Sequence, residues 1–133
     1  IFIEFNDRQN QAQTYHNLGT VAQAQRQWDA AADYYRQALQ IKIEFNDRYS
    51  QGSTLNQLGE LAKEQEQWEP SADYYLQAIT IAVEFKDDYR VQTRTQGLAQ
   101  VWQASGQGAG IPARLAVLLG LTPAQAEERL RAA

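Results

Sequence analysis

The sequence predicts an all-α protein built as a solenoid of stacked helical hairpins. Residues 1–40 and 41–80 are identical at 21 of 40 aligned positions without a gap. A third copy begins at Ile81 and loses its similarity after Gly106. A fixed period of this length indicates supersecondary units that bury their apolar faces against one another. Apolar residues recur at spacings of three and four within each copy, and no long alternating run predicts a strand.

The first half of each copy is predicted to be a helix, which in the second copy covers about residues 48–65. Its apolar stripe comprises Leu55, Leu58, Leu61 and Ala62. Asp47 precedes this stripe and is expected to cap the helix, because an N-cap carboxylate accepts hydrogen bonds from unpaired backbone N–H groups. Asp7 and Asp87 hold the same place in their copies, so we expect helices to begin there too.

A second helix is predicted over about residues 69–85, after a tight turn. Its apolar face comprises Ala72, Tyr75, Ala78, Ile79, Ala82, Val83 and Phe85. Pro70 falls in its first turn, where the missing N–H costs nothing, and Asn46 is expected to end the equivalent helix of the first copy. Small residues (Gly59, Ala72) and large ones (Trp68, Tyr75) are the complementary sizes that antiparallel helix packing requires.

The C-terminal part departs from the repeat, because Gly108 stands where a third tryptophan is expected. A short helix is predicted over 111–119 and ends at Gly120. Thr122 and Gln125 then predict the capping box of a last helix that ends near residue 131. We interpret 107–133 as a degenerate second helix of the third unit followed by a capping helix.

The recurring residues resemble the tetratricopeptide repeat (TPR) signature over roughly residues 1–106. The first copy carries Tyr15, Leu18, Gly19, Trp28, Ala31, Tyr35 and Ala38, and the second carries Leu58, Gly59, Trp68, Ser71, Tyr75 and Ala78. Leu55 replaces the first aromatic residue, and Ile43 and Val83 stand where a proline usually closes the repeat. The period is 40 residues instead of 34, as in the longer variants of kinesin light chains and of bacterial multi-repeat signalling proteins.

This resemblance implies a right-handed superhelix with a defined order of units. We expect 1–7 to be the end of a preceding helix B, 8–47 to be unit 1, 48–87 to be unit 2, and 88–106 to be helix A of unit 3. The chain therefore resembles the C-terminal part of a longer array, acting as a non-enzymatic scaffold for protein–protein interaction.

The resemblance also implies that the helices A line a concave face that binds a peptide or a partner domain. The polar residues expected there are Gln13, His16, Asn17, Thr20, Gln23, Ser53, Asn56, Gln57, Glu60, Lys63, Glu64, Thr93, Gln96, Gln100 and Gln103. Amide side chains both donate and accept hydrogen bonds, so they suit a peptide backbone. TPR domains that clamp a C-terminal carboxylate use Lys and Asn where this chain has His16 and Thr20, which argues against that ligand.

Few residues in the sequence predict catalysis or a cofactor. Cysteine is absent, and His16 is the only histidine, without partners at a metal-ligand or catalytic spacing. The pair Asp29 and Asp33 is explained by compensation of the helix dipole. Neither a metal site nor a cofactor is expected, and we expect no enzymatic activity.

Two other functions are kept as alternatives. The segment around Ala116, Gly120 and Gln125 resembles a helix-turn-helix, but the net charge of −4 makes nucleic acid an unlikely partner. A purely structural or self-associating role would use the N-terminal apolar residues Ile1, Phe2, Ile3 and Phe5 in contacts between copies. No membrane span is predicted, and the lack of cysteine suits a cytoplasmic location.

Overall fold

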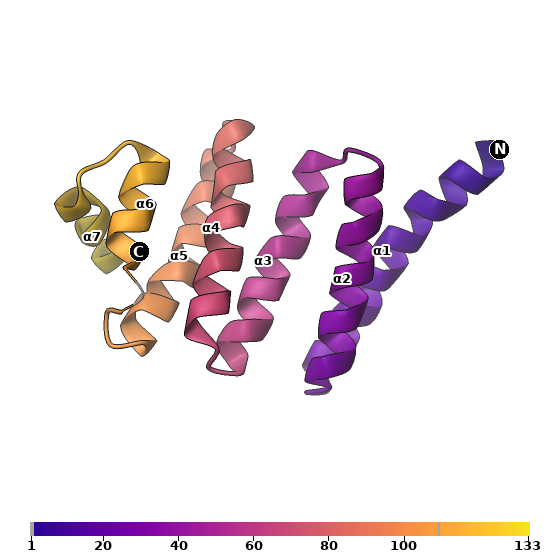
Figure 1. Cartoon of the computed structure of the whole chain (residues 1–133), viewed down its shortest axis with the longest axis horizontal. Helices are drawn as coiled ribbons and strands as arrows, with labels where there is room; N and C mark the ends of the chain where they lie inside the picture. Colours follow the sequence, from indigo (N-terminus) through magenta and orange to yellow (C-terminus); the bar gives the residue numbers. More distant parts are fainter. Residues whose placement is uncertain (1, 109) are drawn as a thin grey trace.

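A computed structural model describes residues 2–108 and 110–133, with side chains from residue 7 onward. Seven helices lie in these residues: α1 (Phe2–Ala24), α2 (Trp28–Glu44), α3 (Arg48–Glu64), α4 (Trp68–Glu84), α5 (Asp88–Ala104), α6 (Ile111–Leu119) and α7 (Pro123–Ala132). The described residues contain no strand. Successive helices are antiparallel and follow one another along the long axis of the molecule (Figure 1). The all-α solenoid predicted from the repeats is thus confirmed.

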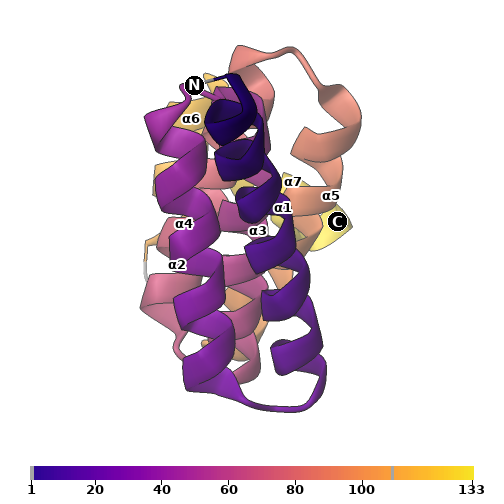
Figure 2. The same cartoon turned by 90° about the vertical axis from the view of Figure 1, so that its right-hand side faces the viewer.

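The helices form two layers. Viewed along the stack, α2, α4 and α6 lie on one side, whereas α1, α5 and α7 lie on the other (Figure 2). Helix α3 packs on α4 as α1 packs on α2, and it also contacts α5. We call the layer of α1, α3, α5 and α7 the inner layer, and that of α2, α4 and α6 the outer layer. None of the helices in the described residues is long and apolar enough to cross a membrane.

The turns between the first five helices share one backbone geometry. Each contains a residue in the left-handed conformation, and these residues are Arg26, Asn46, Glu66 and Lys86. In the turn at Asn46, the Asp47 N–H reaches back to the Lys42 carbonyl at 2.9 Å, which is the closing bond of a Schellman motif. The residue that donates this bond is also the N-cap of the next helix. Because the helices α2 to α5 have 17 residues each, the backbone repeats every 20 residues.

The caps predicted for the second and third copies are confirmed. The Asp47 carboxylate accepts a hydrogen bond from the Ser50 N–H at 3.3 Å, and that of Asp87 accepts one from the Arg90 N–H at 3.1 Å. Asp7 was expected to do the same, but α1 runs through it without a break. The segments before and after Asp7 belong to one helix. A continuous helix keeps its backbone hydrogen bonds instead.

Glycine and tyrosine fix the contact between the layers. The Tyr35 ring lies so close to Gly19 that a Cβ there would be 2.6 Å from Tyr35 Cε1. Tyr75 packs in the same way between Gly59 and Gly97, where a Cβ would be 3.1 Å and 2.6 Å from the ring. These glycines are therefore required for the close approach of an aromatic ring and not for a turn.

The C-terminal helices complete a core with α4 and α5. Trp102 is almost fully buried there among Ile111, Leu115, Ala126 and Leu130. Trp102 stands where the earlier copies have alanine. In the third unit a tryptophan of α5 therefore fills the core, whereas position 108, where the earlier copies have tryptophan, is a glycine. The predicted helix end at Gly120 and the capping box of Thr122 with Gln125 are both present.

Candidate protein-binding face

The inner layer has a hollow of about 730 Å³ between α1 and α3. It is lined by Thr20, Gln23, Ala24, Arg26, Trp28, Gln57, Glu60 and Glu64. Five of these belong to the set of site residues predicted from the sequence. The structure therefore brings side chains about 40 residues apart in the chain to one concavity, because equivalent helices lie next to each other.

Beneath this hollow, a buried hydrogen-bond network joins the two layers. The Tyr35 hydroxyl donates to Gln23 Oε1 at 2.7 Å, and Gln23 Nε2 donates to Glu64 Oε1 at 2.8 Å. The Gln57 amide contacts the same hydroxyl at 3.4 Å. Gln23 is only 7 % exposed, so its amide connects α1, α2 and α3 and is not free for a partner. Its role is to hold the neighbouring polar groups in fixed positions.

His16 belongs to a second internal cluster on the same face. Its Nδ1 lies 3.3 Å from the Thr54 hydroxyl, and its ring meets Tyr35 edge-on at 5.5 Å. The Lys42 ammonium donates to the same Thr54 oxygen at 2.7 Å. Burial, followed by the charge of Lys42, lowers the pKa of His16 below its usual value. His16 is therefore held neutral beside a cation, which is a structural arrangement.

A second hollow, of about 590 Å³, lies between α5 and α7. It is lined by Gln96, Ala99, Gln100, Gln103, Ala104, Leu130, Arg131 and Ala133. Three of the predicted glutamines meet here. The Lys63 ammonium donates to Gln100 Oε1 and so links α3 to α5 between the two hollows. The inner layer thus presents a mainly polar hollow between α1 and α3 and a mainly apolar one, bordered by three glutamines, between α5 and α7.

The remaining predicted residues lie outside the two hollows. Exposed Gln13 and Asn17 bond to each other at 3.0 Å, and the Thr93 hydroxyl donates to a carbonyl of its own helix. Ser53 and Asn56 are half-buried on α3. Sequence reasoning missed two groups that line the first hollow, because Arg26 is a turn residue and Trp28 had been assigned to the core. They reach the concavity because the turn between α1 and α2 lies beside α3.

The electrostatics of the first hollow are mixed, with a negative excess. Glu60 and Glu64 supply two carboxylates, whereas Arg26 supplies one cation. The same carboxylates act on Tyr75, whose pKa is raised by burial first and by their charges second. A ligand that neutralises Glu60 and Glu64 would fit this part of the face better than an anionic one. The described residues contain no group of three or more His, Cys, Asp or Glu side chains placed to hold a metal ion.

The residues that would read DNA in a helix-turn-helix have other partners in α6 and α7. Gln125 Oε1 accepts a hydrogen bond from the Thr122 N–H at 2.9 Å and thereby closes the capping box. Ala126 is fully buried in the core, and Glu127 forms an ion pair with Arg131. The predicted apolar contact through Ile1, Phe2, Ile3 and Phe5 lies outside the described side chains.

Comparisons with known proteins agree with the fold. The family model described as tetratricopeptide repeat matches residues 10–82, which is more than half of the chain. A search of curated proteins finds no match. The matched range extends from within α1 to within α4 and so covers most of the first two hairpins. The chain belongs to the tetratricopeptide repeat family.

Proposed function

We propose that this chain is a non-enzymatic protein-interaction module whose partner binds as an extended peptide across α1, α3 and α5. TPR repeats commonly mediate protein–protein interaction, and the family is a non-catalytic scaffold family. The observation that supports this use of the inner layer is the pair of hollows on one face. The first combines amides and carboxylates over a hydrogen-bonded base, and the second combines three glutamines with an apolar surface.

The side chains of the face suit a peptide backbone. The amides Asn56 and Gln57 of α3, and those on successive turns of α5, offer both donors and acceptors, so they can bond to backbone N–H and C=O groups of an extended chain. Because Gln23, Tyr35 and Glu64 are already ordered by each other, binding would cost little side-chain entropy at this point. Glu60 and Glu64 would favour a peptide with a positive charge at the first hollow.

The proposal is tested by selecting peptides from a random displayed library on the wild-type chain. The affinity of each selected peptide is then measured by calorimetry against a triple variant, Asn17→Ala, Asn56→Ala and Gln96→Ala. These residues lie on the inner layer and have no part in the buried network. We expect affinity to fall at least about tenfold, because each lost amide removes hydrogen bonds to the ligand.

A matched control removes amides from the outer layer. Gln40 and Gln77 are exposed on α2 and α4, and their change to alanine should leave affinity unchanged. Peptides that bind the inner-layer variant as tightly as the wild type would contradict the proposal. So would peptides that lose affinity only when Gln40 and Gln77 are changed.

A further inference from the structure

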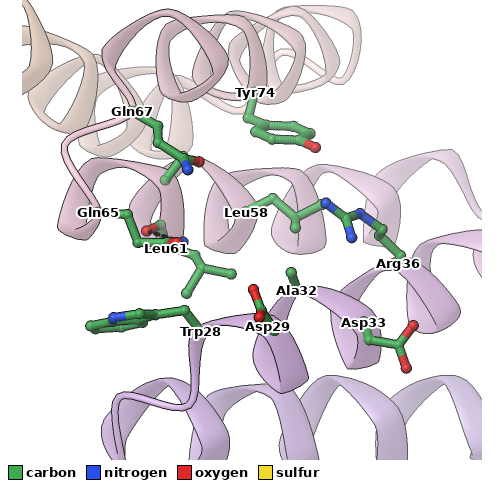
Figure 3. Close-up of a pocket in the computed structure, with 11 residues that line it drawn as sticks. Trp28, Asp29, Ala32, Asp33, Arg36, Leu58, Leu61, Gln65, Gln67 and Tyr74 are labelled. Carbon is green, nitrogen blue, oxygen red and sulfur yellow. Dashed lines mark hydrogen bonds between the residues drawn. The ribbon is translucent and has the colours of Figure 1, made fainter.

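A separate groove of about 390 Å³ opens where α2, α3 and α4 meet. Figure 3 shows Trp28 and Tyr74 at opposite ends of the groove, with Asp29 and Asp33 along α2. Leu58 and Leu61 of α3 lie between them, and the Arg36 guanidinium reaches toward Leu58. Two aromatic rings and two carboxylates around an apolar floor are the surroundings that a guanidinium group prefers. None of these residues belongs to the hydrogen-bond network of the inner layer.

The repeat shows what the equivalent position of the next unit holds. Forty residues after Asp33, the Asp73 carboxylate on α4 forms an ion pair with Arg114 on α6. Asp73 and Arg114 are 41 residues apart, as are Asp33 and Tyr74, which both line the groove. In the second unit, Asp73 is therefore paired with an arginine of the same chain, Arg114. In the first unit, the position equivalent to Arg114 is Tyr74, and a groove lies between it and Asp33.

The charges in the first groove are not neutralised within the chain. Asp33 Oδ2 accepts one hydrogen bond, from Gln37 Nε2 at 2.9 Å. Asp29 forms no ion pair with any described residue, and Arg36 lines the groove without an ion pair to either aspartate. Two carboxylates thus face one cation, so an additional positive charge is electrostatically favoured here.

We propose that this outer groove binds an arginine side chain presented by a basic segment of a partner protein. The guanidinium would pair with Asp33, as Arg114 pairs with Asp73, and would lie on the same wall of the groove as Tyr74. Arginine fits better than lysine because its planar group can stack on a ring and bond to a carboxylate at the same time. The groove shares Trp28 with the first hollow of the inner layer but none of that hollow's charged groups, so changes to Asp29 and Asp33 test it separately from the function proposed for the inner layer.

The test titrates acetyl-Gly-Arg-Gly-amide into the whole chain while NMR follows the indole N–H signals. Trp28, Trp68 and Trp102 are the only tryptophans, and each gives one signal. We expect the Trp28 signal to shift saturably and the other two to remain in place. The same peptide with citrulline, a neutral isostere of arginine, should produce no saturable shift of Trp28.

The decisive variant changes Asp29→Asn and Asp33→Asn together. Both side chains are exposed, so the fold should persist, and we expect affinity for the arginine peptide to fall about tenfold with the charge. The matched control is Glu69→Gln, which holds the place of Asp29 in the second unit but does not line the groove; it should bind as the wild type does. Three outcomes would overturn the proposal: no saturable Trp28 shift, equal binding of the citrulline peptide, or undiminished binding by the double variant.

Discussion

His16 is a polar residue of the inner layer whose side chain contacts other residues of the fold instead of facing solvent. The sequence places it on the polar side of a helix among groups that could face a ligand. In the fold it is half-buried between Thr54 and Tyr35, next to the Lys42 ammonium. That environment depends on a contact between residues 38 positions apart, which periodicity within one helix cannot reveal.

The lowered pKa of His16 predicts a pH dependence of stability. The unfolded chain binds a proton near the ordinary pKa of about 6.5, whereas the folded chain binds it only at lower pH. The free energy of unfolding should therefore fall as pH decreases through about 6.5 and level off below the folded pKa. Chemical denaturation between pH 7.5 and 5.5 measures this slope.

The control for the pH dependence is His16→Gln, which matches Gln96 at the equivalent place in the third copy. It should abolish the part of the slope that His16 contributes, because no other histidine titrates in this range. A slope that is identical in the wild type and the variant would show that His16 titrates alike in both states.

At the scale of single residues, the sequence identified the polar groups of the face but not their availability. Thr20, Gln57, Glu60 and the glutamines of α5 do line hollows. The spacing of Gln23 predicts the same surface for it. In the fold, however, it is buried, and its amide is hydrogen-bonded to Tyr35 of α2 and Glu64 of α3. Spacing gives the direction of a side chain, whereas its availability depends on what the adjacent element places over it.

At the scale of elements, the two helices of the second unit could be predicted to within about a residue, because its apolar stripe and its caps repeat those of the first. The left-handed residues of the turns are harder to predict from the sequence. Asn46 signalled a left-handed residue, but Arg26, Glu66 and Lys86 adopt the same conformation without any glycine or asparagine. The Schellman hydrogen bonds and the packing of the next helix outweigh a strain of roughly 1 kcal/mol at each of these residues.

Two contacts between successive units, α2 with α3 and α4 with α5, each contain one buried cation. The outer helix supplies it in the first contact, and the inner helix supplies it in the second. Between α2 and α3, Lys42 reaches the Thr54 hydroxyl at 2.7 Å. Between α4 and α5, the equivalent residues are Ala82 and Arg94, and Arg94 Nη1 donates to the Ala78 carbonyl at 2.6 Å. Both cations are less than a tenth exposed. Each contact thus has room for one long cationic side chain, supplied either by the outer or by the inner helix.

This exchange predicts strong coupling between positions 82 and 94. Ala82→Lys alone should destabilise the chain, because it adds a second cation beside Arg94. Arg94→Thr alone should also destabilise it, because a buried side chain is lost. The double variant reproduces the α2–α3 contact and should recover about 1–3 kcal/mol relative to the sum of the single effects. Urea denaturation of all four chains measures this double-mutant cycle, and strictly additive losses would refute the exchange.

Helix α1 begins before Asp7, the residue at which the sequence predicts a helix start. The sequence before Asp7 matches the segments before Asp47 and Asp87, so a helix boundary was expected at all three. At Asp47 and Asp87 the turn lets a new helix pack on the one before it. At Asp7 the chain makes no turn, and α1 continues through it. The same local sequence is thus followed by a turn at two of its three places.

At the scale of the whole molecule, stacking of the repeated units creates two different surfaces. The inner layer gathers the varying amides and carboxylates of α1, α3 and α5. The outer layer gathers the aspartates and aromatic rings that follow each inter-helix turn. From the sequence, the TPR resemblance predicts the inner layer as the binding surface. It could not predict the outer groove, which appears only where Arg114 has no counterpart in the preceding unit.

The most direct test of the central claim, that the inner layer is the protein-binding face, maps where a selected peptide contacts the chain. Backbone amide signals of the isotope-labelled chain are assigned and followed by NMR while the peptide is added. We expect the largest shifts in α1, α3 and α5, centred on Gln57, Glu60 and Gln100, with α2 and α4 little changed. Shifts confined to α2 and α4, with Gln57, Glu60 and Gln100 unmoved at saturation, would contradict the claim.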